Sequence, residues 1–208
     1  MHTEIIPASS EHAIARALEI LQSGGLIAFP TDTVYGVGAL AFDGKAVESI
    51  YAAKDRPVEK AIPILIGDPE HLEKIGTNIP NAARRLASRF WPGALTILVP
   101  KREDLPEAVS ANSTVGVRVP DHDVARALLR AAGPMAVTSA NISGAQSPVT
   151  AQDVHEQLEG RIALIIDGGR TPGGVASTLV DCTAAELKIL REGPITLEEL
   201  HSALNDSD

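Results

Sequence analysis

Short apolar segments recur along this chain, and longer segments between them space their apolar residues as on one face of a helix. The short segments are rich in Val, Ile and Leu and are bounded by Gly, Pro or Asp, which predicts β-strands. The predicted strands cover residues 25–30, 61–67, 94–100, 115–120, 134–139, 161–167, 177–181 and 187–192. The helical pattern covers residues 11–25, 45–54, 81–90, 123–133 and 150–160. Alternation of this kind predicts an α/β fold around one sheet.

Residues 162–191 carry successive predicted strands with no helix between them. Parallel neighbours need a long crossover connection, so part of the sheet is expected to be antiparallel and the whole sheet mixed. Thr196 and Glu199 have the spacing of a capping box, which predicts a last helix over 197–204 before a short polar tail. The chain has no repeat or linker, so we expect residues 1–208 to form a single domain.

The overall charge limits the classes of partner. The chain carries 18 Lys and Arg against 27 Asp and Glu, a formal charge of −9. This balance disfavours broad adhesion to nucleic acid or to anionic membranes, but it leaves room for a local basic pocket. No apolar segment approaches the roughly 18 residues of a membrane span, and no signal peptide is evident, so we expect no membrane association. The single cysteine, Cys182, fits a reducing, cytoplasmic location and a buried position beside a strand.

Three cations gather in the segment YAAKDRPVEKAIPILI at 51–66, which is unusual in an acidic chain. They are Lys54, Arg56 and Lys60. Pro57 disfavours a helical conformation at the residue before it, so the cluster is predicted to lie on a loop. Such a loop either projects into solvent or binds an anion.

Polar residues also follow or interrupt several predicted strands. The segment PTDTVYGVGA at 30–39 combines hydroxyl groups with glycines, as a ligand-binding loop or an ordinary turn does. Arg118 lies between valines, where its charge either reaches solvent from an edge or faces a pocket that holds an anion. Ser139 and Asn141 end a strand, which is where open α/β sheets bind ligands. The glycine-rich segment 168–174 is either a loop that closes over a ligand or a plain surface loop.

Two kinds of site find no support in the sequence. There is no GxxxxGK[ST] motif, so a nucleotide would be held without a Walker loop. The six histidines are scattered and form no recognised metal-binding spacing, so no protein-held metal site is predicted.

Taken in chain order, these segments resemble the YrdC-like family. The segments are PTDTVYGVGA, Lys54-x-Arg56, FWPGALTILV, VGVRVP, Ser139-x-Asn141, STLVD and LREG, and the match runs from about residue 14 to residue 195. The family consists of threonylcarbamoyl-AMP synthases, nucleotidyltransferases that condense L-threonine, bicarbonate or CO2, and ATP to threonylcarbamoyl-AMP and pyrophosphate. The resemblance implies a twisted mixed sheet with flanking helices and a concave basic groove. Longer relatives carry a second domain, so the short, single-domain form is expected.

The resemblance also implies roles for individual residues. The catalytic residues would be Lys54, Arg56, Ser139 and Asn141. ATP would contact Arg56, Lys60, Thr114, Ser139, Ser147 and Arg191. Threonine would contact Thr33, Arg118, the backbone of Val137 and Ser177. Some relatives have a histidine near the position of Leu65, so the leucine leaves one threonine contact open. Mg²⁺ is expected to be bound mainly through the phosphates of ATP.

The resemblance implies that the product serves tRNA modification. A partner complex would transfer the threonylcarbamoyl group to the adenosine next to the anticodon. Two alternatives stay open at this point: a double-stranded RNA or tRNA binding module without this catalysis, and an enzyme that adenylates a different carbamate. Dependence of pyrophosphate release on threonine and bicarbonate would separate the three.

Overall fold

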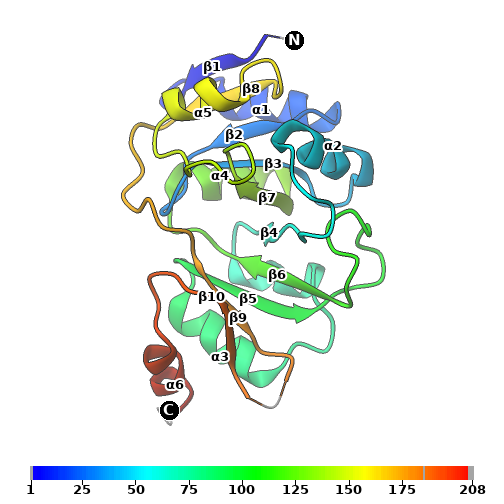
Figure 1. Ribbon diagram of the computed structural model, residues 1–208, viewed down its shortest axis with the longest axis vertical. Coiled ribbons are helices and arrows are strands. Elements are labelled where there is room, and N and C mark those ends of the chain that lie inside the picture. The colour runs from blue at the N-terminus through cyan, green and yellow to red at the C-terminus, as the bar shows by residue number, and fades with distance from the viewer. Residues whose placement is uncertain (1, 185, 206–208) are drawn as a thin grey trace.

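The computed structural model describes residues 2–184 and 186–205 and arranges their strands in a mixed sheet flanked by helices (Figure 1). The strands are β1 (Glu4–Pro7), β2 (Ile27–Phe29), β3 (Gly36–Leu40), β4 (Ile64–Leu65), β5 (Leu95–Pro100), β6 (Thr114–Arg118), β7 (Met135–Ser139), β8 (Leu164–Asp167), β9 (Thr178–Asp181) and β10 (Lys188–Arg191). The helices are α1 (Ala13–Gln22), α2 (Gly44–Lys54), α3 (Asn81–Phe90), α4 (Asp123–Ala132), α5 (Ala151–Leu158) and α6 (Leu197–Asn205), with a 3₁₀ segment η1 (Pro69–Lys74).

The strand order across the sheet is β1-β8-β2-β3-β7-β4-β6-β5-β9-β10. The pairs β1–β8, β2–β8, β4–β6 and β5–β9 are parallel, and the pairs β2–β3, β3–β7, β4–β7, β5–β6 and β9–β10 are antiparallel. The expected mixed sheet is therefore confirmed. Within 162–191, the antiparallel pair is β9–β10, whereas β8 joins the opposite half of the sheet.

Every predicted strand and helix is present, with boundaries that differ by a few residues. The capping box is confirmed, because the Glu199 carboxylate accepts from the Thr196 backbone at 2.8 Å and the Thr196 hydroxyl accepts from Glu199 N at 3.3 Å. Strands β1 and β3 were not predicted. The polar tail falls mainly on residues 206–208, outside the described residues.

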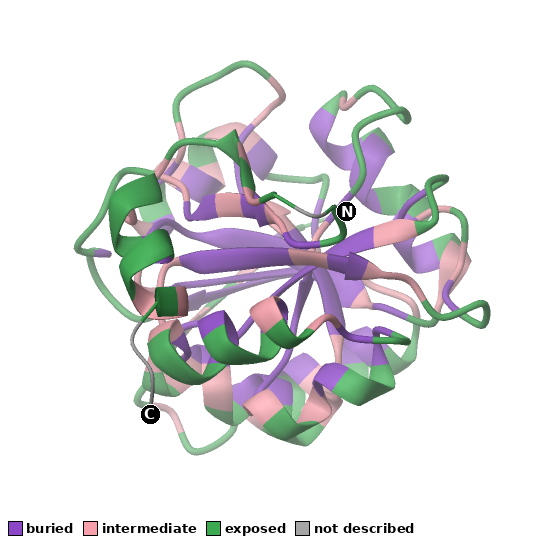
Figure 2. Ribbon diagram, turned by 90° about the horizontal axis from the view of Figure 1, so that it is seen from below, coloured by how far each residue is buried: buried purple, intermediate pink, exposed green. Residues whose placement is uncertain are grey.

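Successive residues of the central strands point to opposite faces of the sheet, as the pleat requires. In β2, Ile27 and Phe29 belong to one buried cluster and Ala28 belongs to the other. The first cluster includes residues of α1 and α4, and the second includes residues of α2, α3 and α5. We call these the α1/α4 face and the α2/α3/α5 face. Figure 2 shows the largely buried strands between helices with exposed outer sides.

The α1/α4 cluster contains no residue of β5, β6 or β9. On these strands Val117, Ile97 and Val180 belong to the opposite cluster. The residues next to these three in sequence therefore point to the α1/α4 face. They do not belong to the cluster that α1 and α4 form there. This part of the sheet is where the pocket described below lies.

Two further features of the structure relate to the sequence analysis. Cys182 is buried, as expected, and burial raises the pKa of its thiol to about 12. Among the described residues, no helix combines the length and the apolar character that crossing a bilayer requires.

Strand β3 was missed because its glycines, which are unfavourable in strands, suggested a turn. In the fold these glycines face β7, and a Cβ on Gly36 would lie 2.6 Å from a methyl group of Val137. A Cβ on Gly38 would lie 2.6 Å from the Ala136 carbonyl oxygen and 2.8 Å from the Val137 side chain. The two glycines therefore allow β3 to pack closely against β7, and Gly36 also lines the pocket described below.

We expect Gly38→Ala to destabilise the fold by about 2 kcal/mol or more, because the carbonyl of the paired strand cannot move away without breaking the pairing. Gly44→Ala is the matched control, since its Cβ would meet Pro106 at an ordinary 3.4 Å at the start of a helix. That change should leave the free energy of unfolding within about 0.5 kcal/mol. Chemical denaturation of both variants checks this, and equal stability would contradict the packing argument.

Candidate active site

A pocket of about 600 Å³ opens on the α1/α4 face, beyond the part that α1 and α4 cover. Its floor comes from β5, β6 and β9, which contribute Thr96, Leu98, Gly116, Arg118 and Leu179. Its walls come from the turn before β3, the loop after α2, the end of β7 and the segments around β9 and β10. They contribute Thr31, Thr33, Val34, Gly36, Arg56, Lys60, Ala61, Ile62, Pro63, Leu65, Val137, Thr138, Ser139, Ala176, Ser177, Leu190 and Arg191.

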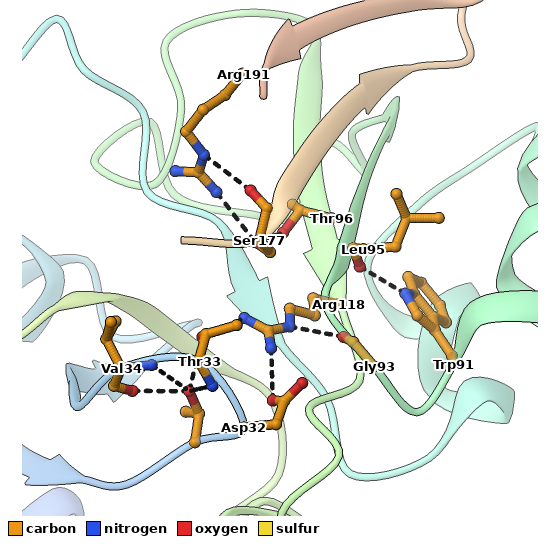
Figure 3. A network of polar contacts seen from close by, with 11 residues as sticks. Asp32, Thr33, Val34, Trp91, Gly93, Leu95, Thr96, Arg118, Ser177 and Arg191 are labelled. Atoms are coloured by element: carbon orange, nitrogen blue, oxygen red, sulfur yellow. Dashed lines mark hydrogen bonds and ion pairs between the residues drawn. The ribbon is translucent and has the colours of Figure 1, made fainter. Parts of the chain in front are cut away.

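Arg118 is the buried cation of the pocket, with 5% of its surface exposed. Its guanidinium donates to the Asp32 carboxylate at 2.5 Å, to the Thr33 hydroxyl at 3.1 Å and to the Gly93 carbonyl at 2.8 Å (Figure 3). A guanidinium has five N–H groups, so two remain for a ligand. Burial lowers the pKa of Arg118, and the charge of Asp32 opposes this effect.

Of the two environments that the sequence left open for Arg118, the structure shows a pocket rather than a solvent-exposed edge. The sequence reading did not identify Asp32, although a buried arginine requires a counter-charge. Asp32 lies in the PTDTVYG segment, and the turn that brings it to Arg118 is held by Thr31, whose hydroxyl donates to the Val34 carbonyl at 2.7 Å. An aspartate between two threonines was the available signal, but its partner lies 86 residues away.

A second arginine approaches from the end of β10. Arg191 donates to the carbonyl and to the hydroxyl of Ser177, each at 3.0 Å, and Ser177 in turn shares a 2.7 Å hydrogen bond with Thr96 (Figure 3). These acceptors are neutral, so the charge of Arg191 is directed by the protein without being neutralised there. Thr96 was also missed by the sequence reading, because it lies inside an apolar strand.

The loop after α2 supplies the remaining cations. Arg56 donates to the Lys60 carbonyl at 3.2 Å and to the Ala61 carbonyl at 2.9 Å, which folds the loop around its guanidinium. Both Arg56 and Lys60 line the pocket, so the expectation that the loop carries pocket cations is supported by their position.

The three arginines are close enough to affect one another. Burial is the largest cause that lowers the pKa of Arg191, and the charges of Arg118 and Arg56 lower it further. Burial also lowers the pKa of Arg56. Because like charges repel, a protein that gathers them in one pocket is prepared for an anionic ligand.

Lys54 is the last residue of α2 and is 1% exposed, which agrees with the helix predicted over 45–54 and not with the loop predicted for the cation cluster. The helix continues to Lys54 because the residue restricted by Pro57 is Arg56, and Asp55 ends the helix in a left-handed conformation with φ 51°. The Lys54 ammonium donates to the backbone carbonyls of Ser139 and Asn141. Lys54 therefore lies behind the pocket and holds the segment that presents Ser139.

The other predicted site residues divide into two groups. Thr33, Val137, Ser139 and Ser177 line the pocket together with the cations. Asn141, Thr114 and Ser147 are not part of its lining. The amide of Asn141 donates to the carbonyls of Ile142 and Ala145, each at 2.8 Å. Leu65 lines the pocket, and its hydrocarbon side chain offers no hydrogen bond to a ligand.

Comparison with known proteins identifies the family. The Sua5_yciO_yrdC family model, described as "Telomere recombination", matches residues 19–193. The chain belongs to this family. It is 43% identical over 198 residues to the threonylcarbamoyl-AMP synthase of Pyrococcus abyssi and 42% identical over 199 residues to that of Bacillus subtilis. Both matches cover 94% of this chain and 58% of the relative, so the chain spans little more than half the length of these relatives.

A relative of similar length also matches. A putative threonylcarbamoyl-AMP synthase of Mycobacterium tuberculosis is 40% identical, with 95% of this chain and 92% of the relative covered. Among solved structures, P. abyssi Sua5 complexed with L-threonine has a TM-score of 0.93 at 41% identity and covers 99% of this chain and 61% of that one. E. coli YciO has a TM-score of 0.84 at 28% identity and covers 96% and 98%. These likenesses confirm the YrdC-like fold predicted from the sequence.

We expect Lys54→Met to lower the free energy of unfolding by about 2 to 4 kcal/mol, because two buried carbonyl groups lose their donor. Lys45→Met, at the exposed start of the same helix, is the control and should change it by less than about 0.5 kcal/mol. Chemical denaturation measures both. A Lys54 variant as stable as the Lys45 variant would contradict the structural role of Lys54.

The stability contributed by Lys54 should also depend on pH. Burial, and to a lesser extent the charge of Arg56, lowers the pKa of Lys54 from 10.5 to about 7. Between these values the unfolded chain binds more protons than the folded one, so the free energy of unfolding rises with pH. Relative to Lys54→Met, the wild type should therefore gain stability as the pH increases from about 7 towards 10.5. A pH-independent difference between the two would count against this assignment.

Proposed function

We propose that this chain is an L-threonylcarbamoyladenylate synthase. It would condense L-threonine, bicarbonate or CO2, and ATP to threonylcarbamoyl-AMP and pyrophosphate, which is nucleotidyltransferase chemistry. The observation that carries the proposal is the convergence of Arg56, Lys60, Arg118 and Arg191 with hydroxyl groups in one pocket. Membership of the family and the threonine complex of P. abyssi Sua5 support it.

The two ends of the pocket suit the two larger substrates. Around Arg118, the Thr33 hydroxyl and two unused N–H groups form a small polar site that fits the carboxylate and hydroxyl of threonine. In the described part of the chain, Arg56 and Arg191 bond only to neutral acceptors, which leaves their charge, together with that of Lys60, for phosphate groups. Ser139, whose carbonyl accepts from Lys54, lines the same pocket.

The chemistry needs alignment and charge stabilisation more than an acid–base pair. A neutral threonine amine attacks CO2 and forms a carbamate, losing one proton, and a carbamate oxygen then attacks the α-phosphorus as pyrophosphate leaves. The pocket cations favour the uncharged amine and the anionic carbamate, and they stabilise the charge that moves to pyrophosphate.

Mg²⁺ fits this scheme as an ion carried by ATP. In the described part of the chain, no group of three or more His, Cys, Asp or Glu residues gathers that could hold a metal ion. The Asp32 carboxylate is engaged by Arg118. Phosphate oxygens would therefore supply most of the ligands, and the metal would add neutralisation of the leaving pyrophosphate.

The product would be consumed by a tRNA threonylcarbamoyl-transfer complex, which modifies the adenosine next to the anticodon in the cytoplasm. A mixed anhydride of a carbamate and AMP hydrolyses readily, so a direct hand-over to that complex would protect it. Any tRNA binding by this chain would serve the hand-over.

The proposal predicts pyrophosphate release that requires threonine and bicarbonate together. ATP, Mg²⁺ and labelled bicarbonate are incubated with each amino acid in turn, and labelled adenylate is measured. Only threonine should give a strong signal. Release with a different carbamate source, or binding of RNA with no adenylate formed, would support one of the alternatives and overturn the proposal.

Two arginine variants, one in the pocket and one outside it as a control, test the proposal in the same assay. Arg191→Ala should reduce kcat/KM by about a hundredfold, because a phosphate-directed charge is lost. Arg89→Ala, which removes an exposed arginine of α3, should leave it unchanged.

A further inference from the structure

The chain has two tyrosines, and each buries its ring and directs its hydroxyl to a loop beside the pocket. Tyr35 is 0% exposed and Tyr51 is 7% exposed. Neither lines the pocket, so neither would touch a ligand directly. Burial raises the pKa of both, to about 12 for Tyr35, so each hydroxyl keeps its proton as a donor.

Tyr35 fixes the start of the glycine-rich segment 168–174. Its hydroxyl donates to the Gly169 carbonyl at 2.7 Å and accepts from Gly168 N at 3.2 Å. One hydroxyl therefore satisfies a donor and an acceptor of the same turn. Because the ring is fully buried next to β3, the turn is tied to the rigid sheet.

From that turn the segment runs to Thr33, which lines the pocket and bonds to Arg118. Gly174 N donates to the Thr33 carbonyl at 3.0 Å, and a Cβ on Gly173 would lie 2.8 Å from the same carbonyl oxygen. Three residues later the chain reaches Ser177, which lines the pocket. The position of the turn that Tyr35 holds therefore affects where the segment contacts Thr33 and where Ser177 lies in the pocket.

Tyr51 contacts the loop after α2, which carries Arg56 and Lys60. Its hydroxyl lies 2.8 Å from the Ala108 carbonyl and 3.3 Å from the Lys60 carbonyl. The Lys60 carbonyl also accepts from the Arg56 guanidinium at 3.2 Å. The single proton of Tyr51 is donated to Ala108 in the shorter contact and reaches the Lys60 carbonyl in the longer one, so Tyr51 links the loop that carries Arg56 to the segment around Ala108.

We propose that Tyr35 and Tyr51 are positioning residues with different substrates: Tyr35 orders the loop at the threonine end, and Tyr51 orders the loop that directs Arg56 and Lys60 to ATP. The assignment rests on the proposed function for the identity of the two ligands. Each hydroxyl acts through the backbone of its own loop, so the two effects are separable.

The test compares Tyr35→Phe with Tyr51→Phe, which keep the buried rings and remove only the hydroxyls. Affinities for L-threonine and for ATP with Mg²⁺ are measured by calorimetry, and KM for each is measured in the adenylate assay. Tyr35→Phe should weaken threonine binding by about three- to tenfold and leave ATP binding nearly unchanged, because one hydrogen bond that orders the loop is lost. Tyr51→Phe should show the reverse pattern.

Limited trypsin digestion reports on the loops without any activity. Arg170 and Lys60 lie in the two loops and are exposed, whereas the bond after Arg56 precedes proline and resists trypsin. Tyr35→Phe should accelerate cleavage after Arg170, and Tyr51→Phe should accelerate cleavage after Lys60. Each variant should leave the other site at the wild-type rate.

Thr3→Val controls for a general loss of stability. The buried Thr3 hydroxyl donates to the Ile162 carbonyl at 2.7 Å and accepts from Gly160 N at 2.9 Å, away from the pocket. This variant should change neither affinity nor either cleavage rate.

The outcomes separate the two proposals. Equal effects of both tyrosine variants on both ligands, or unchanged cleavage rates, would overturn the assignment of the tyrosines. A wild type that binds both ligands but forms no adenylate would overturn the proposed function, while the pattern of affinities still decides the tyrosine assignment. A wild type that binds neither ligand would overturn both.

Discussion

The pleat of the sheet is the constraint on which the pocket depends. Because side chains alternate between faces, valines and isoleucines of β5, β6 and β9 fill the α2/α3/α5 core, and the residues between them must face the other way. On β2, β7 and β8 that other face is covered by α1 and α4. On β6 it carries Arg118, whose charge could not be buried under an apolar helix. The same alternation therefore builds the core and leaves a place for a charged ligand.

The pocket then combines two ways of holding a cation. Arg118 has a protein carboxylate, Asp32, so its desolvation is compensated before any ligand arrives. Arg56 and Arg191 are oriented by carbonyl and hydroxyl oxygens, which direct a guanidinium without cancelling its charge. The first arrangement suits a small anion that needs a defined geometry. The second suits a ligand that brings several charges of its own.

The parts of this structure that could be predicted are those set by neighbours in sequence. The pattern of valines around Arg118 was enough to place it on a strand, and the cost of burying its charge was enough to predict a polar environment. Strand β3 could not be found in this way, since the favourable packing of Gly36 and Gly38 depends on Val137, about a hundred residues away. The role of Lys54 was equally hidden, because its acceptors lie 85 and 87 residues along the chain. The individual site roles were predicted from resemblance to a family. The structure places some of these residues, such as Arg118 and Ser139, in the pocket lining and others, such as Asn141, outside it.

The lowered pKa values of the pocket arginines have a consequence for binding. Burial and repulsion from Arg118 and Arg56 destabilise the charged form of Arg191 in the folded protein relative to water. Its hydrogen bond to Ser177 holds the side chain in this position. An anion that enters between Arg56, Arg118 and Arg191 removes part of this repulsion and adds charge-assisted hydrogen bonds. An anion therefore offsets part of the unfavourable energy of placing these arginines close together. The formal charge of −9 does not oppose such binding, because the net charge acts over the whole surface, whereas the arginines act at contact distance inside one pocket.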